Sequence, residues 1–219
     1  MERNLEKREI IQGLEQYKKA LYIIDMNNGF VNFGNMANPE YNLLVPEQLK
    51  LVEKIRKEKG VLNFILDAHT PESSELREYP EHCLIGSEEA QIIPELISEQ
   101  DQPDTMIFYK NSINGILESD VQKSIKSLKN LREAIFCGVC ADLCVMDFVR
   151  SYARFLDMID HEAKLFVVKN AIDTFDGVGH NREEWLDISY KVMEQAGVIV
   201  VDDINELEEQ ERKLGLYRK

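Results

Sequence analysis

Short apolar segments rich in β-branched residues alternate along the chain with segments whose apolar residues recur every three to four positions. The first pattern is typical of buried strands and the second of amphipathic helices. The pattern predicts strands at Ala20–Asp25, Val61–Asp67, Met106–Tyr109, Ala134–Gly138, Leu165–Val168 and Val198–Val201. It predicts helices at 46–58, 88–98, 118–129, 142–157 and 183–196, and two further polar helices over the first sixteen residues and over 204–214.

This order of elements predicts an α/β fold. Near-continuous apolar strands that alternate with helices indicate a parallel sheet covered on both faces. We therefore expect a three-layer sandwich of Rossmann type with a six-stranded parallel sheet. No repeat or linker divides the sequence, so one domain over 1–219 is expected, with 1–17 and 204–219 as peripheral helical additions. In such sheets, functional residues collect beyond the carboxyl ends of the strands.

Composition and charge restrict the classes of partner. The formal net charge of −14 disfavours non-specific binding to nucleic acid, because phosphates would be repelled. No apolar run approaches the roughly 20 residues that span a bilayer, and the charged N-terminus lacks the apolar core of a signal peptide. These features predict a cytoplasmic protein that acts without nucleic acid or membrane.

Reactive side chains fall at the predicted carboxyl ends of several strands. Asp25 ends the first strand, Asp67 and His69 end the second, Lys110 follows the third, and Cys144 lies one turn into the helix after the fourth. Each has an ordinary alternative, since a carboxylate can cap a loop, a lysine can be solvated and a cysteine can simply pack. Their convergence on one edge of one sheet favours a catalytic site.

The residue types suit nucleophilic catalysis by a thiol. A helix N-terminus and a nearby ammonium lower the pKa of a thiol, so we expect Lys110 and the helix start to lower that of Cys144. Asp25 would accept the thiol proton and return it to a leaving amine. The backbone N–H groups of Cys140 and Cys144 would form the oxyanion hole.

The cysteines allow a second interpretation. Three of the four form C-x2-C-x3-C at Cys137, Cys140 and Cys144, a spacing that could hold a metal or cluster, while Cys83 stands apart. Cluster ligands more often come from irregular loops, whereas Cys137 falls within a predicted strand, where a thiol packs as a small apolar group. Disulfides are not expected in a cytosolic chain.

A second group of polar residues lies in DAHTPESSELREYPEHC. Residues i and i+2 of an extended backbone face the same side, so Asp67 and His69 could bind one ion together with Glu75 and His82. Imidazole and carboxylate ligands suit zinc, iron or manganese. From spacing alone, two unrelated histidines and a surface carboxylate explain the segment equally well.

The motifs together resemble a known family. IDMNNGF, DAH, YPEHCLIGSEEAQIIPEL, FYK and CGVCADLCV occur in the order seen in the nicotinamidase branch of the isochorismatase-like cysteine hydrolases, and the resemblance runs from about residue 20 to 201. It implies that Asp25, Lys110 and Cys144 form a catalytic triad. It also implies a cis peptide bond between Val139 and Cys140, and aromatic contacts to the substrate from Phe30 and Tyr79.

The resemblance also implies a metal and a reaction. Asp67, His69, Glu75 and His82 match metal ligands, and one divalent transition metal is implied, zinc with iron or manganese as alternatives. The implied reaction is hydrolysis of nicotinamide to nicotinate and ammonia through a thioester. A related amidase or carbamoyl hydrolase acting on another small amide, or a binding module without activity, remain as alternatives. Family members are often oligomers, which leaves a homo-oligomer open.

Four positions depart from the family pattern. Ala68 replaces the usual tryptophan of D-W-H, and Ile113 and Asn114 replace residues that can line the pocket. The common Thr-Asp before the nucleophile becomes Ala141–Asp142. A further histidine, His180, matches one that follows the fifth strand in relatives, and we interpret it as structural or as part of a subunit contact. The departures bear on the identity of the amide.

Overall fold

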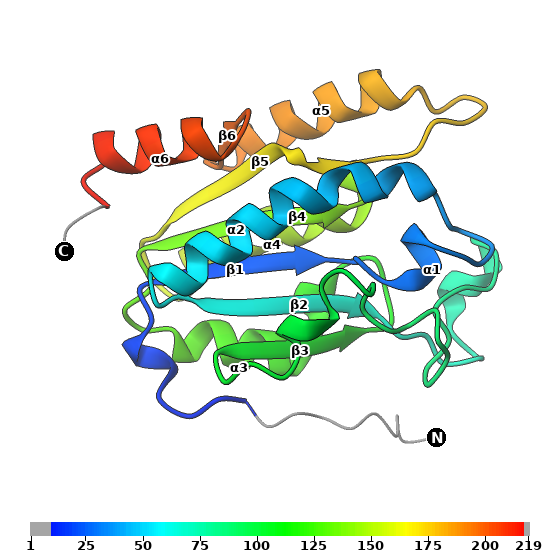
Figure 1. The fold of residues 1–219 in the computed structure, drawn as a ribbon, viewed down its shortest axis with the longest axis horizontal. Helices are drawn as coiled ribbons and strands as arrows, with labels where there is room; N and C mark the ends of the chain where they lie inside the picture. The colour runs from blue at the N-terminus through cyan, green and yellow to red at the C-terminus, as the bar shows by residue number, and fades with distance from the viewer. Residues whose placement is uncertain (1–9, 217–219) are drawn as a thin grey trace.

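One parallel sheet organises residues 10–216, the part of the chain that the computed structural model describes (Figure 1). Its strand order is β3-β2-β1-β4-β5-β6, and every neighbouring pair is parallel. The strands are β1 (Lys19–Ile24), β2 (Val61–Asp67), β3 (Thr105–Lys110), β4 (Glu133–Val139), β5 (Lys164–Asp173) and β6 (Ile199–Val201).

Helices cover both faces of the sheet, which makes three layers (Figure 1). Helix α2 packs on β1 and β2 and also contacts α6, whereas α4 and α5 contact each other on the opposite face. The α-helices are α1 (Asn28–Val31), α2 (Val45–Lys57), α3 (Ser119–Ser127), α4 (Met146–Met158), α5 (Arg182–Gln195) and α6 (Ile204–Lys213). Short 3-10 helices span Leu14–Gln16, Pro39–Leu44, Ser74–Arg77, Ile97–Glu99 and Gly115–Leu117.

The core lies on both faces of the central strands. Every residue of β2 and of β4 is buried, because helices cover each side. This burial explains why the central strands are continuous apolar runs rather than alternating patterns. Among the described residues, no helix has both the length and the apolar character that crossing a membrane requires.

The strand order reverses between β1 and β4, and ligand sites of open α/β sheets lie at such a point. Gly138 makes the close approach of the two strands feasible there. Its φ is 123°, and a Cβ atom at this position would lie 1.9 Å from the carbonyl oxygen of Ile24. Only glycine fits both the conformation and the space.

A buried ion cluster lies at the opposite, amino-terminal edge of the sheet. Lys19 of β1 contacts Glu133 at 3.1 Å, and it contacts Glu58 and Glu211 at 2.7 Å each. Lys54 of α2 contacts Glu58 at 2.5 Å and Glu211 at 2.8 Å. The cluster therefore joins the first strand, helix α2 and the last helix.

All six predicted strands are present with ends within one or two residues, except that β5 is longer and continues to Asp173. The prediction of a helix at 88–98 is wrong. This segment is irregular because it pairs with the chain after β1: Asn28 N–H donates to Gln91 O at 2.9 Å and Ile93 N–H donates to Met26 O at 3.1 Å. Pro94 within it also lacks the N–H that a helix needs.

The helix predicted over the first sixteen residues is also not observed where the structure describes the chain. Residues 1–9 lie outside the described part, and 10–16 contain only the 3-10 turn Leu14–Gln16. The polar helix after β6 is present as α6, and 217–219 lie outside the described part.

Candidate active site

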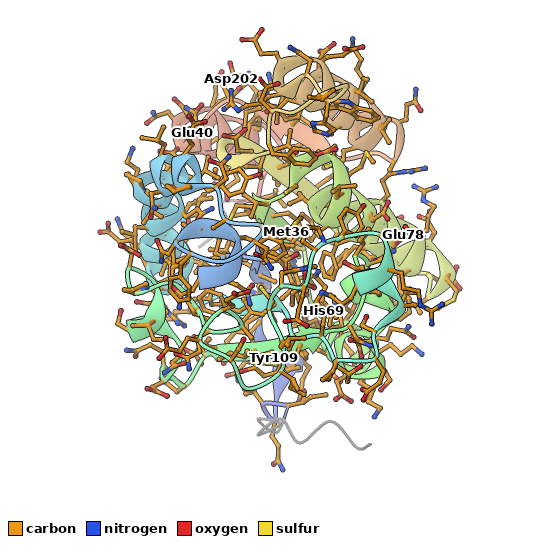
Figure 2. All side chains as sticks on the ribbon, turned by 90° about the vertical axis from the view of Figure 1, so that its right-hand side faces the viewer. Met36, Glu40, His69, Glu78, Tyr109 and Asp202 are labelled. Carbon is orange, nitrogen blue, oxygen red and sulfur yellow. The ribbon has the colours of Figure 1, made fainter. Side chains whose placement is uncertain are left out.

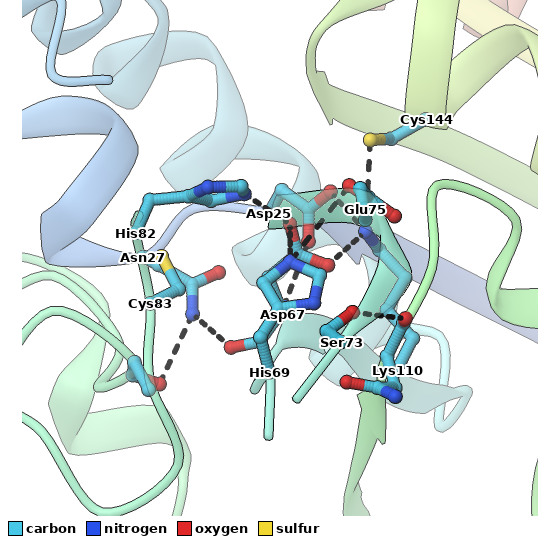
Figure 3. Close-up of polar contacts among 12 residues, drawn as sticks. Asp25, Asn27, Asp67, His69, Ser73, Glu75, His82, Cys83, Lys110 and Cys144 are labelled. Carbon is cyan, nitrogen blue, oxygen red and sulfur yellow. Dashed lines mark hydrogen bonds and ion pairs between the residues drawn. The ribbon is translucent and has the colours of Figure 1, made fainter. Parts of the chain in front are cut away.

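Asp25, Lys110 and Cys144 meet at the carboxyl edge of the sheet, although they come from three separate strand ends (Figure 3). Lys110 Nζ lies 2.8 Å from Asp25 Oδ2 and 3.6 Å from Cys144 Sγ. All three side chains are buried. An ammonium, a carboxylate and a thiol in one water-excluded group can exchange a proton and create a nucleophile.

Asp25 is held by the strand beside it. It follows β1 with φ of 52°, its N–H donates to Ile65 O at 2.8 Å, and its Oδ1 accepts from Asp67 N–H at 3.0 Å. Burial and the Asp67 carboxylate raise the pKa of Asp25 to about 7, although Lys110 acts in the opposite direction. A carboxyl with this pKa can both take and return a proton near neutral pH.

Lys110 lies between two carboxylates. Besides Asp25, its Nζ contacts Oδ1 of Asp67, the residue opposite Lys110 in the pairing of β2 with β3. Burial alone would lower the pKa of Lys110, but the charges of Asp25 and Asp67 outweigh it and raise that pKa well above its ordinary value. Lys110 is therefore a permanent cation beside the thiol.

Cys144 corrects one expectation from the sequence. Burial raises the pKa of its thiol well above the ordinary value, and Lys110 only partly offsets this effect. The ammonium does act in the expected direction, but the net pKa is raised rather than lowered, because desolvation of a fully buried thiolate is the larger effect. The thiol therefore keeps its proton at rest and loses it to a neighbouring base.

A tight turn carries Cys144 from β4 into α4. The peptide bond between Val139 and Cys140 is cis, the geometry that the family resemblance implied for this bond. A single π-helical turn over Ala141–Val145 then precedes α4. The first N–H groups of a helix have no partner within it, so those at this turn can bind an anion.

The second predicted group also converges. Asp67, His69, Glu75 and His82 each offer a ligand atom, and these atoms all lie within 4.8 Å of one another. His69 Nε2 lies 3.3 Å from Asp67 Oδ2 and 3.8 Å from Glu75 Oε1. A pair of backbone hydrogen bonds between His69 and the 83–85 segment brings His82 to the end of β2.

The donor set fits a cation. Nδ1 of His82 lies 2.7 Å from Pro80 O, which can only accept, so Nδ1 carries a proton, while Nε2 lies 3.5 Å from Asp67 Oδ2. Both ring nitrogens of His69 and Oδ2 of Asp67 are buried without a hydrogen-bond partner. Buried polar atoms are normally satisfied, and ligating histidines typically donate their other N–H to a carbonyl. In a view onto the carboxyl edge of the sheet, His69 lies near the middle of the molecule (Figure 2).

A cavity of about 630 Å³ opens beside the turn that carries Cys144, since Cys140 is one of its lining residues. The two aromatic residues that the resemblance assigned to the substrate, Phe30 and Tyr79, both line it, and so does Cys140. The ring of Phe30 also lies 5.3 Å from that of His82. The other lining residues are Asn35, Met36, Ala37, Asn38, Glu40, Tyr41, Pro80, Phe175 and Asp176.

The four positions that depart from the family pattern are absent from this lining. Ala68 is fully buried, and Ile113 packs against the core. Asn114 donates to Ser151 Oγ at 2.8 Å and accepts from Ile116 N–H at 3.1 Å, so it caps a 3-10 turn. These departures therefore change the packing around the site and leave the lining of this cavity to other residues.

Sequence reasoning missed two residues that hold the site together. Asn27 donates its side-chain amide to Asp67 O at 3.1 Å and to Ala90 O at 3.0 Å. Glu89 Oε2 accepts from Cys83 N–H at 2.9 Å, directly after His82. Both lie within motifs that carried the resemblance, which was the available signal, but their long-range contacts could not be read from spacing.

Comparisons with known proteins agree with this architecture. The isochorismatase domain model matches residues 19–204. Nicotinamidase 1 of Arabidopsis thaliana is 31% identical over 171 residues, which cover 72% of this chain and 70% of that protein. Pyrazinamidase of Pyrococcus horikoshii in complex with zinc shares the fold, with 20% identity and a TM-score of 0.68 over 84% of this chain and 99% of that chain. N-carbamoylsarcosine amidase of Thermoplasma acidophilum also shares it, with 22% identity and a TM-score of 0.67 over 84% of this chain and 96% of that chain. The protein belongs to the isochorismatase family, and within it to the branch that contains this plant nicotinamidase.

Proposed function

We propose that this protein is a cysteine amidohydrolase that converts nicotinamide to nicotinate and ammonia. The observation that carries the proposal is the buried contact of Lys110 with both Asp25 and Cys144 beside an aromatic-lined cavity. The match to Nicotinamidase 1 of Arabidopsis thaliana supports the choice of substrate.

In the first half of the reaction, Asp25 takes the proton of Cys144. The Lys110 cation stabilises the thiolate as it forms, and the sulfur attacks the amide carbon. The carbonyl oxygen becomes an oxyanion that accepts hydrogen bonds from the N–H groups of Cys140 and Cys144. Asp25 returns the proton to the amide nitrogen, the C–N bond breaks, ammonia leaves and a thioester remains.

In the second half, water replaces ammonia. Asp25, again a carboxylate, takes a proton from water as the oxygen attacks the thioester carbon. The same N–H groups stabilise the second oxyanion. The C–S bond breaks, the sulfur recovers the proton from Asp25, and nicotinic acid is released, which gives its proton to water and becomes nicotinate. A pKa of Asp25 of about 7 suits this alternation, because neither protonation state is costly near neutral pH.

Asp67, His69, Glu75 and His82 would hold one divalent transition metal, for which zinc is the first choice and iron or manganese the alternatives. When bound, the metal would supply a Lewis acid that anchors the ring nitrogen of a pyridine amide and so orients its carboxamide. The structure of pyrazinamidase from Pyrococcus horikoshii contains zinc. Phe30 and Tyr79 would flank the ring.

The charge of the cavity favours a neutral amide over the alternative, a carbamoyl amino acid. Glu40 and Asp176 line the cavity, and no lysine, arginine or histidine is among its described lining residues. A substrate that carries a carboxylate, as N-carbamoylsarcosine does, would meet repulsion there. Nicotinamide is uncharged, and the nicotinate product would be repelled.

Ammonia release from nicotinamide, compared with release from N-carbamoylsarcosine and a panel of aliphatic amides, tests the proposal. We expect nicotinamide to have the highest kcat/KM, and one metal ion per active chain by elemental analysis. Preference for a carboxylate-bearing amide, or full activity of protein without metal, would reject the nicotinamidase assignment. A complete lack of hydrolysis would favour a binding module.

A further inference from the structure

A histidine outside the proposed triad contacts the turn that carries Cys144. His180 Nε2 lies 2.8 Å from Asp142 Oδ2, and the other carboxylate oxygen accepts a hydrogen bond from the Thr174 hydroxyl. Asp142 lies in the π-helical turn between Cys140 and Cys144, and its side chain is 3% exposed. One buried carboxylate therefore ties this turn to the segment after β5.

Each ring nitrogen of His180 lies beside an acceptor oxygen. Its Nδ1 lies 3.0 Å from Phe175 O, while its Nε2 faces Asp142. A carbonyl and a carboxylate can only accept, so the ring makes both hydrogen bonds when each nitrogen carries a proton. In that state the contact with Asp142 is a charge-assisted hydrogen bond, which is about twice as strong as a neutral one.

Two aromatic rings hold the imidazole in place. His180 stacks on Phe175 with ring centroids 3.8 Å apart and on Trp185 with centroids 5.2 Å apart, and both pairs are nearly parallel. Stacking on aromatic faces suits a cation and fixes the ring orientation. His180 is thus too closely constrained to be a freely rotating surface side chain.

The same loop forms part of the cavity wall. Phe175 and Asp176 line the cavity together with Cys140, which is two residues before Asp142. The contact between His180 and Asp142 therefore connects the wall to the turn that carries both oxyanion N–H groups. Displacement of this turn would move those donors more than it would move Phe30 and Tyr79, which belong to other segments.

We propose that His180 and Asp142 are positioning residues that hold the N–H groups of Cys140 and Cys144 where the oxyanion forms. The role concerns the amide hydrolysis proposed above and rests on it. Neither residue is among the lining residues of the cavity. Their loss should therefore lower kcat and leave KM nearly unchanged, because misplaced oxyanion donors weaken the transition state more than the ground state.

The first test is a set of variants. His180→Ala should lower kcat for nicotinamide about tenfold to a hundredfold, with KM changed less than about threefold. His180→Gln, whose amide can still donate to Asp142, should recover part of the loss. Adding Asp142→Asn to His180→Ala should cost no more than about a further twofold, because residues that act as a unit are not additive.

His161→Ala is the matched control, because the ring of that histidine bonds Leu131 O, at 2.9 Å, and belongs to no part of the site described. Its kcat should equal that of the unchanged protein. If His180→Ala does not fold, His180→Gln and Asp142→Asn carry the test. A kcat within about twofold of the unchanged protein in folded variants, or fully additive losses, would overturn the proposal.

A second measurement separates this proposal from the choice of substrate. Pyridine-3-carbaldehyde reacts with a thiol by forming a C–S bond as the C=O double bond breaks, and the thiol proton passes to the oxygen or to Asp25. The tetrahedral oxygen then takes the place of the oxyanion. Calorimetric affinity should fall about tenfold in His180→Ala. If the affinity for the aldehyde falls in His180→Ala but the unchanged protein does not hydrolyse nicotinamide, the proposed function is wrong and the positioning role stands. Unchanged affinity contradicts the role.

Discussion

Lys110 Nζ lies 2.8 Å from Oδ2 of Asp25, and each side chain is 1% exposed. Two buried carboxylates, those of Asp25 and Asp67, share this single ammonium. Lys110→Met should therefore lower the free energy of unfolding by about 3–5 kcal/mol, because it leaves buried charge uncompensated. It should also reduce ammonia release by about a thousandfold or more. Urea unfolding and steady-state assays measure both effects.

Lys123→Met is the control for this substitution, since Lys123 is 66% exposed and contacts only Asp120, at 3.3 Å, among the ion pairs described for it. Its stability and activity should match those of the unchanged protein. If Lys110→Met were as stable and active as this control, Lys110 would have no role beyond packing.

Cys144→Ala should abolish hydrolysis while the protein stays folded, because the change removes only one sulfur atom from a side chain that is 7% exposed. The circular dichroism spectrum and the thermal midpoint should change little. Cys140→Ala tests the neighbouring thiol: its N–H is retained, so we expect hydrolysis to persist. If Cys144→Ala remained active, or if only Cys140→Ala lost activity, Cys144 would not be the nucleophile.

His82→Ala should lower metal content and raise KM for nicotinamide more than it lowers kcat. The variant removes one of the four clustered ligand atoms but leaves the contact of Lys110 with Cys144 intact. Loss of one ligand typically weakens binding of a metal by orders of magnitude, so dialysis should leave the variant depleted. Elemental analysis after dialysis checks this expectation. Undiminished metal content would show that these residues do not form the site.

Glu133→Gln should reduce the pH dependence of stability. Burial and the neighbouring Glu211 raise the pKa of Glu133 from 4.5 to about 8, whereas Lys19 acts in the opposite direction. The folded protein therefore keeps a proton that the unfolded chain has lost, and stability falls as pH rises from 4.5 through 8. The pKa of Glu211 is lowered, so its stabilising contribution is present above 4.5 and is lost as the pH falls.

Glutamine mimics the protonated form of Glu133 at every pH. Between about pH 5 and about pH 8.5, the unfolding free energy of the unchanged protein should fall by at least about 1 kcal/mol more than that of Glu133→Gln, given about 1.4 kcal/mol for each pKa unit. Urea titrations at several pH values measure this difference. Activity should be retained, because the cluster lies at the edge of the sheet away from Cys144. Parallel pH profiles of the two proteins would contradict the raised pKa.

Gly138→Ala should destabilise the protein by about 3 kcal/mol or more, because the added Cβ meets the Ile24 carbonyl and the backbone has a positive φ. Gly197→Ala is a matched control with φ of 89° and no atom within 4 Å of its added Cβ. It should cost only about 1–2 kcal/mol, the strain of the backbone alone. Thermal or urea unfolding compares the two. Equal costs would mean that β1 and β4 can separate without penalty.

Much of the fold could be predicted from the sequence because the central strands are buried on both faces. Continuous apolar runs such as Val61–Asp67 have few other structures open to them, and a parallel sheet brings the residues at their carboxyl ends together. Asp25, Lys110 and the four clustered ligands were predicted on this basis together with the family resemblance.

The parts that were missed depend on contacts between distant segments. The apolar residues at 90–96 imitate a helix, but they are buried by pairing with the chain after β1. The pKa of Cys144 depends on how completely the site excludes water, which no spacing reports. His180 was interpreted as structural or as part of a subunit contact, and its partner Asp142, 38 residues away, is not recognisable from the sequence.

The ion cluster at the amino-terminal edge has a consequence for synthesis on the ribosome. Lys19 of the first strand bonds Glu211 of the last helix, 192 residues later. Until that helix has left the exit tunnel, Lys19 and Lys54 lack one of their carboxylates, and the edge of the sheet that they close stays accessible to water. The nascent chain should therefore gain its full resistance to proteases only after helix α6 has emerged.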